Sequence, residues 1–136
     1  MTGMPRPIRN QEITPGTVYD DGILKVTAIA TPHCKNSHAY LVESADTAIL
    51  FTGDLKHPTI DFPAIIKEKS LDLVVCESAH FSAMEYLPIF NACNIKKVCI
   101  THYSDVFLAT VLQLKQEMTN RNIPTVIATD NLEIVV

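Results

Sequence analysis

Short apolar runs separated by turn-forming residues recur along the first half of the chain. Three of them occupy residues 23–30, 39–44 and 47–52, and a polar turn at 43–46 separates the last two. Runs of this length, rich in β-branched residues and bounded by turns, are typical of strands. The sheet is therefore expected to begin as a meander of strands.

The second half of the chain alternates between helical and strand patterns. A short helix is predicted at 61–69, with Pro63 in its first turn, and another at 83–93. Residues 104–120 give the clearest helix, because apolar side chains recur there at helical spacing and Ser104 suits the N-cap. Further strands are predicted at 71–76, 97–101, 125–128 and 132–136.

This order of elements predicts the fold class. A strand meander followed by alternating helices and strands indicates a mixed sheet flanked by helices, which is an α/β fold, or α+β in a stricter scheme. No repeat, low-complexity segment or charged linker divides the 136 residues. Residues 1–136 are therefore predicted to form a single domain, with residues 1–14 interpreted as an irregular leader.

Composition narrows the class of protein. Hydrophobic residues make up 47% of the chain and charged residues 19%, so a sizeable core is expected. The net charge is -4 and no Lys/Arg-rich run is present, so nucleic acid is not indicated as a partner and a small-molecule substrate is mildly favoured. No apolar stretch has the length of a secretory signal or a membrane span, so a cytoplasmic protein without a membrane partner is expected.

The cysteines do not indicate a thiolate zinc site. Cys34, Cys76, Cys93 and Cys99 lie far apart, and no pair has the short C-x2-C spacing that such a site needs. Buried free thiols are common in apolar runs, so all four are expected to be reduced.

Metal-competent side chains follow the ends of the predicted strands. His33 comes after 23–30, Asp54 after 47–52, Glu77 and His80 after 71–76, and His102 after 97–101. In sheets with parallel strands, sites collect where the chain leaves the carboxyl ends of neighbouring strands. These residues are therefore the candidates for a site.

Taken singly, none of these residues indicates chemistry. An aspartate after a glycine is commonly a turn residue, and a lone histidine after a strand more often faces solvent or a hydrogen-bond partner. Their joint placement changes the interpretation, because imidazoles and carboxylates are ligands that zinc, manganese and iron prefer.

A family resemblance adds to this pattern. The string TPHCKNSHAYLVESADTAILFTGDL, followed by LDLVVCES and CITHYS, resembles the stretch of the metallo-β-lactamase superfamily in which a ligand histidine precedes a strand pair ending in TGD. The closing ATDNLEIVV is similar to the last hairpin of that family. The resemblance covers roughly residues 15–136 and implies the C-terminal half of an αββα sandwich.

The resemblance also implies roles for individual residues. His33, Asp54 and His102 correspond to metal ligands, and Asp54 to the catalytic aspartate that bridges two ions. Glu77 and His80 would contact those ligands and hold them in position without binding the metal themselves. The metal implied is zinc, or else manganese or iron, and the chemistry is hydrolysis of an ester, thioester, lactam or phosphodiester by water that the metal activates.

One departure from the family limits these expectations. The H-x-H-x-D-H cluster should precede His33, yet no histidine occurs before position 33 in the sequence. Two protein ligands per ion would remain, fewer than the three typical of catalytic zinc, so weak or absent metal binding is expected for this chain alone. His38, His57, Glu77 and His80 could substitute for the missing ligands. His38 and His57 also fit turns, and the family often has an acidic residue with a structural role at the end of the strand that leads to Glu77 and His80.

Two functions therefore remain open. The first is a metal-dependent hydrolase domain, truncated relative to the family and incomplete or inactive by itself. The second is a non-catalytic remnant or regulatory module that keeps the scaffold without a working metal site. Because the missing half would cover an apolar sheet face, the expected partner is a second copy of this chain in a homodimer, or the missing N-terminal half.

Overall fold

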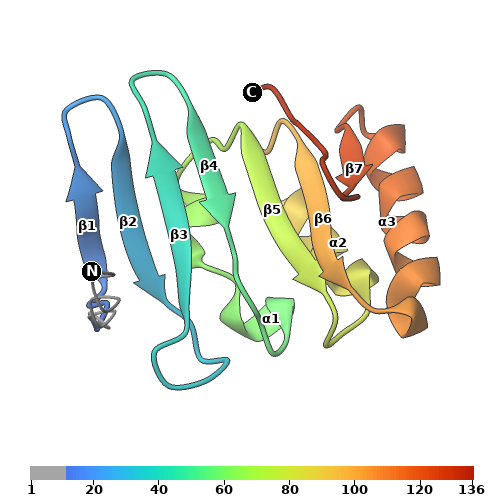
Figure 1. The fold of residues 1–136 in the computed structure, drawn as a ribbon. Coiled ribbons are helices and arrows are strands. Elements are labelled where there is room, and N and C mark those ends of the chain that lie inside the picture. The colour runs from blue at the N-terminus through green and yellow to red at the C-terminus, as the bar shows by residue number, and fades with distance from the viewer. Residues whose placement is uncertain (1–11) are drawn as a thin grey trace, which may run out of the picture.

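A single mixed sheet organises the structure, a computed structural model that describes residues 12–136 (Figure 1). The sheet has seven strands in the order of the sequence. They are β1 (Gly16–Asp20), β2 (Lys25–Ala30), β3 (His38–Glu43), β4 (Ala48–Phe51), β5 (Leu73–Ser78), β6 (Val98–Tyr103) and β7 (Thr125–Ile127). Strands β1 to β4 pair antiparallel, and β4 to β7 pair parallel. The mixed sheet with helices confirms the predicted fold class.

Short helices connect the parallel strands. They are α1 (Pro58–Asp61), η1 (Ala64–Lys67), η2 (Ala83–Tyr86), α2 (Leu87–Asn91), η3 (Asp105–Phe107) and α3 (Leu108–Asn120). No helix among the described residues is long and apolar enough to cross a membrane. The four cysteines are free thiols. Residues 1–11 of the predicted leader lie outside the described part of the chain.

Four sequence predictions need correction. Within the helix predicted at 61–69 the structure has only the single turn η1, and α1 ends at Asp61, because Phe62 before Pro63 is extended at φ -64° and ψ 132°. Ser104 precedes η3 but makes no side-chain cap, and its hydroxyl is buried without a partner. Residues 132–136 form no strand, and β1, which was not predicted, forms one. All five β1 residues are exposed, so no apolar alternation marks the strand in the sequence.

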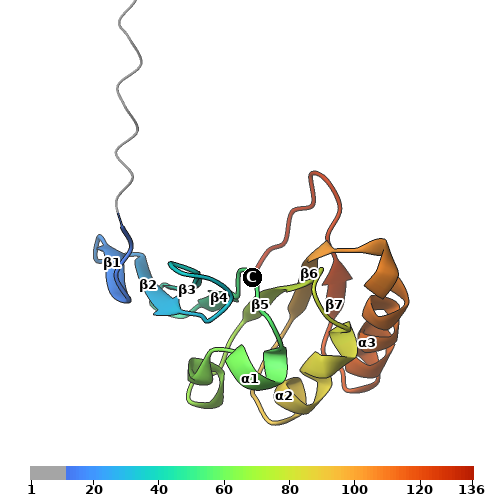
Figure 2. The ribbon, with the colours of Figure 1, turned by 90° about the horizontal axis from the view of Figure 1, so that it is seen from below.

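All the helices lie on one face of the sheet (Figure 2). Alternate strand residues, such as Leu41, Leu50 and Val74, point to that face and join the buried core with Leu114 and Phe90. This packing fixes the carboxyl ends of β4, β5 and β6 relative to one another, since inward side chains of all three strands share one core with the helices.

The opposite face of the sheet is apolar and has no helix over it. Two rows of cross-strand partners lie on that face. In the first row Phe51 of β4 lies between Tyr40 of β3 and Val75 of β5. The other row pairs Val42 with Ile49. Phe51 is 41% exposed. The irregular C-terminal tail runs from β7 to the C-terminus beside β5 on this face (Figure 2).

Candidate metal centre

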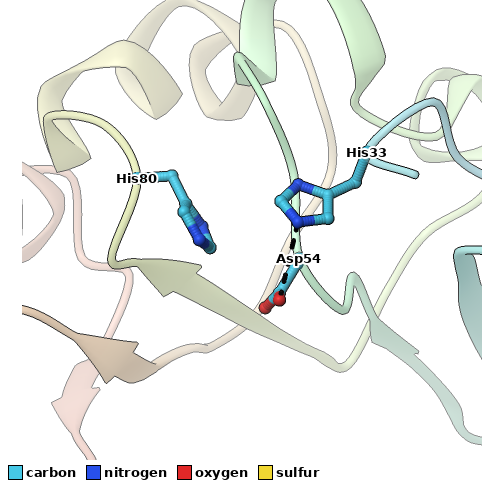
Figure 3. Close-up of side chains that lie close together, drawn as sticks. All are labelled: His33, Asp54 and His80. Carbon is cyan, nitrogen blue, oxygen red and sulfur yellow. Dashed lines mark ion pairs between the residues drawn. The ribbon is translucent and has the colours of Figure 1, made fainter.

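Strand topology brings the candidate residues to one edge of the sheet. Strands β4, β5 and β6 are adjacent and parallel, so their carboxyl ends meet at that edge. Asp54 follows β4, Glu77 lies near the end of β5, and His102 lies near the end of β6. The loop between β2 and β3 delivers His33 to the same place (Figure 3).

Asp54 stands between two imidazoles. Its Oδ1 lies 2.9 Å from His102 Nδ1, and its Oδ2 lies 3.8 Å from His33 Nε2. The first distance is a hydrogen bond, whereas the second is too long for one. Each oxygen of the Asp54 carboxylate thus faces a different histidine. His102 lies 48 residues after Asp54 in the sequence, and His33 belongs to the β2–β3 loop.

A β-bulge aims His102 at this edge. Glu77 pairs with Thr101, but Ser78 pairs with Tyr103, so His102 is the additional residue in β6. Its φ is +44°, in the left-handed region that non-glycine residues rarely adopt. Bulges re-aim side chains and are common beside active sites. This local strain indicates that the position of the imidazole is enforced by the surrounding sheet.

Gly53 is needed immediately before Asp54. Its φ is +61°, and a Cβ built there would lie 2.9 Å from the backbone oxygen of His38. Both observations exclude a side chain at this position without movement of β3 or of the Asp54 segment. The close approach of Gly53 to the backbone of β3 therefore fixes the position of Asp54 at the end of β4.

Replacing Gly53 with alanine is expected to destabilise the fold by more than the same change at Gly22. Gly22 also has positive φ, at +85°, but nothing lies within 4 Å of its Cβ position. Alanine in the left-handed region costs about 1–2 kcal/mol at either site, and only Gly53→Ala adds the clash with His38. Chemical denaturation of both variants measures the difference. Equal losses would contradict the proposed close approach.

Glu77 is the buried acceptor behind the cluster. Its side chain is 2% exposed. Oε1 accepts the Leu55 amide at 2.8 Å, and Oε2 accepts the Ala79 amide at 2.7 Å. Its backbone oxygen accepts the Tyr86 hydroxyl at 2.6 Å. Glu77 therefore ties the residue after Asp54 to the exit of β5, and its carboxylate is committed to holding the backbone.

His80 lies inside the cluster. Its Nδ1 is 2.8 Å from Glu77 Oε1, and this hydrogen bond raises the pKa of His80 above its ordinary value. The ring centroid lies 4.9 Å from that of His33 and 5.7 Å from that of His102. Figure 3 shows the His80 ring beside that of His33, with Asp54 close to His33.

The other two histidines lie outside the cluster. His38 Nδ1 contacts the backbone oxygen of Asn36 at 2.9 Å, and His57 Nδ1 lies 3.5 Å from Glu85. Neither belongs to a group that could hold a metal among residues 12–136. The suggestion that they replace the missing ligands has no geometric support.

The donor set fits a divalent metal. Candidate ligand atoms of His33, Asp54 and His80 all lie within 4.8 Å of one another, as do those of Asp54, Glu77 and His102. Donors on a tetrahedral zinc lie roughly 3.3 Å apart, because each bond is about 2.0–2.1 Å long. Small side-chain movements would therefore close the first group around an ion, whereas the Glu77 carboxylate of the second group already accepts two backbone amides. A cavity of about 200 Å³ borders the cluster, with Phe51 and Val75 in its wall.

Comparison with known proteins identifies the architecture. No protein-family model matches the chain, and no curated protein matches its sequence. A candidate Zn-dependent hydrolase of the metallo-β-lactamase superfamily from Thermotoga maritima matches 68% of the chain with a TM-score of 0.54 and 18% identity. This is the metallo-β-lactamase fold. The same fold comparison matches 88% of the chain to the short form of human tRNase Z, at a TM-score of 0.59 and 16% identity.

The match covers only part of each solved structure. A mutant of the β-hydroxylase CmlA matches 79% of the chain with a TM-score of 0.63 and 8% identity. The chain spans 30% of the length of that protein, 48% of the Thermotoga maritima protein and 46% of tRNase Z. At these identities the likeness establishes the fold, and it leaves activity and substrate to be proposed.

The predicted site residues come together as expected in space. His33, Asp54 and His102 meet at one edge of the sheet, and Glu77 stands behind them. Their role as ligands stays a prediction. Sequence reasoning gave His80 as a supporting residue and as one of four substitutes for the missing ligands, and its ring lies beside that of His33. The sequence feature that indicated His80 was its position three residues after Glu77, just after the end of β5, which lies between β4 and β6.

Proposed function

We propose that this chain is the metal-binding part of a metal-dependent hydrolase. One observation carries the proposal. His33 and His102 come from separate segments of the chain, and each places an imidazole nitrogen near one oxygen of the Asp54 carboxylate. Imidazole nitrogen and carboxylate oxygen suit zinc best among the metals considered, with manganese and iron as further candidates. A bound divalent ion supplies positive charge that lowers the pKa of water and polarises the bond to be cleaved.

The residues of the chain would divide the remaining work. His33 and Asp54 would hold one ion, and His102 and Asp54 would hold a second, since each histidine faces a different oxygen of the Asp54 carboxylate. Glu77 fixes the backbone after Asp54 by accepting the Leu55 amide. We propose a small ester, thioester, lactam or phosphodiester as substrate, because the chain has a net charge of -4 and no basic run.

A non-catalytic scaffold is the second candidate. It is favoured by the absence of any histidine before His33 in the sequence, since a two-metal site needs more ligands than remain. Under the hydrolase proposal, those ligands come from a further segment or chain, as the partial coverage of the matched structures suggests. Metal binding at the cluster separates the two candidates.

Zinc titration of the Asp54→Asn variant tests the proposal. Asparagine keeps the shape of Asp54 but removes its charge and one strong donor oxygen, so zinc affinity is expected to fall at least about 100-fold, since even indirect partners of metal ligands are worth 10–100-fold. Isothermal titration calorimetry measures the affinity and the stoichiometry. The matched control is His57→Gln, because His57 lies outside the cluster. Equal zinc affinity in both variants and the unchanged chain would refute the proposed metal centre.

We also propose that a second copy of the chain covers the open sheet face. The residues Val42, Ile49, Phe51 and Val75 on that face are uncharged and half-buried or exposed. Strands lie about 4.8 Å apart and rise about 3.3 Å per residue, so the 27 residues of β1 to β5 give a flat footprint of roughly 430 Å². Side chains standing off the sheet add to that area, which brings it toward the 800 Å² or so per partner of a standard interface.

A further inference from the structure

A third imidazole completes a ligand set that the sequence alone left short. His80 leaves the end of β5, between the strands that precede Asp54 and carry His102. Ligand atoms of His33, Asp54 and His80 lie within 4.8 Å of one another. The three residues come from three different segments, so their convergence is a property of the fold and not of local chain geometry.

Glu77 fixes which nitrogen of His80 is free. The Glu77 carboxylate already accepts the amides of Leu55 and Ala79, so it acts as a hydrogen-bond acceptor toward His80 as well. His80 Nδ1 must then carry the proton and donate it, which leaves the Nε2 lone pair unused in the neutral ring. A carboxylate that holds one nitrogen of an imidazole while the other binds an ion is a recurrent arrangement in metal sites.

We propose that His80 is a direct metal ligand, which with His33 and Asp54 forms a three-ligand site contained in this chain, and that Glu77 positions His80. This inference rests on the proposed function and assigns a further ligand to the same site. Three protein ligands is the number typical of catalytic zinc. The chain alone is therefore expected to bind one zinc ion per molecule, although a two-metal site would still need ligands from elsewhere.

The His80→Gln variant tests this assignment. Glutamine can still donate a hydrogen bond to Glu77, so the hydrogen bonds from Glu77 to the backbone should be retained. It offers no imidazole nitrogen, so the proposed metal ligand is lost. Zinc affinity by calorimetry is expected to fall at least about tenfold. The visible spectrum of the Co²⁺-substituted chain, which reports ligand number and geometry, is expected to change. The His57→Gln variant should match the unchanged chain in both measurements, and thermal denaturation checks that each variant folds.

Each result decides the inference. A His80→Gln variant with unchanged affinity and Co²⁺ spectrum, alongside a weakened Asp54→Asn variant, would overturn the role of His80 and leave the proposed function standing. Equal weakening of His57→Gln and His80→Gln would also overturn it. If the unchanged chain bound neither zinc nor Co²⁺, the assignment of His80 and the proposed function would both fail.

Discussion

Replacing Glu77 with alanine is expected to lower the free energy of unfolding by about 3–4 kcal/mol. The side chain is 2% exposed and accepts the Leu55 and Ala79 amides through separate oxygens. Truncation leaves buried donors without partners, at about 1–3 kcal/mol each, and opens a cavity beneath the site. The loss is large because one carboxylate connects two strand exits.

Glu85→Ala is the matched control for this prediction. Glu85 is a partly exposed carboxylate that faces a histidine, His57, at 3.5 Å. Its removal is expected to cost no more than about 1 kcal/mol, because exposed ion pairs contribute little to stability. Urea denaturation of both variants gives the comparison. A Glu77→Ala variant as stable as Glu85→Ala would show that the Glu77 network does not hold the site.

Replacing Val42 with lysine is expected to abolish self-association of the chain. Val42 lies on the open sheet face opposite Ile49, and the proposed homodimer buries that face. In a two-fold dimer the substitution enters twice, so two charges would be buried without partners. The dissociation constant measured by sedimentation equilibrium is expected to rise at least about 100-fold, which corresponds to roughly 2.7 kcal/mol.

Leu112→Lys is the control for the dimer. Leu112 is 52% exposed on α3, on the helix side of the sheet, and the proposed interface does not include it. This variant should associate as the unchanged chain does. A chain that sediments as a monomer at micromolar concentration, or a Val42→Lys variant that still dimerises, would contradict the proposal that a second copy covers the sheet.

The predicted fold followed from strongly patterned segments. Helix α3 was predicted because its apolar positions recur at helical spacing, and Val111, Leu114 and Met118 are buried as that pattern requires. The strand predicted at 132–136 is wrong, because an apolar run also fits a tail that crosses a sheet without pairing. β1 was missed since its residues are all exposed and its pairing depends on β2.

The site could be predicted in part. The histidine and aspartate at strand exits were visible in the sequence, and the family resemblance gave them an order. His80 was among the candidates, but its hydrogen bond to Glu77 and the closeness of its ring to His33 could not be predicted, because both depend on the strand order and on the path of the loop after β5. The bulge at His102 was also invisible, since register is a property of the paired strands.

The location of zinc in crystals of the metal-loaded chain tests the central claim most directly. Anomalous scattering at the zinc edge is expected to give one peak within about 2.0–2.2 Å of a carboxylate oxygen of Asp54 and of an imidazole nitrogen of His33. If His80 is a ligand, its Nε2 lies at the same distance. Zinc bound only at His57, Cys34 or another surface position, with no peak beside Asp54, would contradict the proposed metal centre.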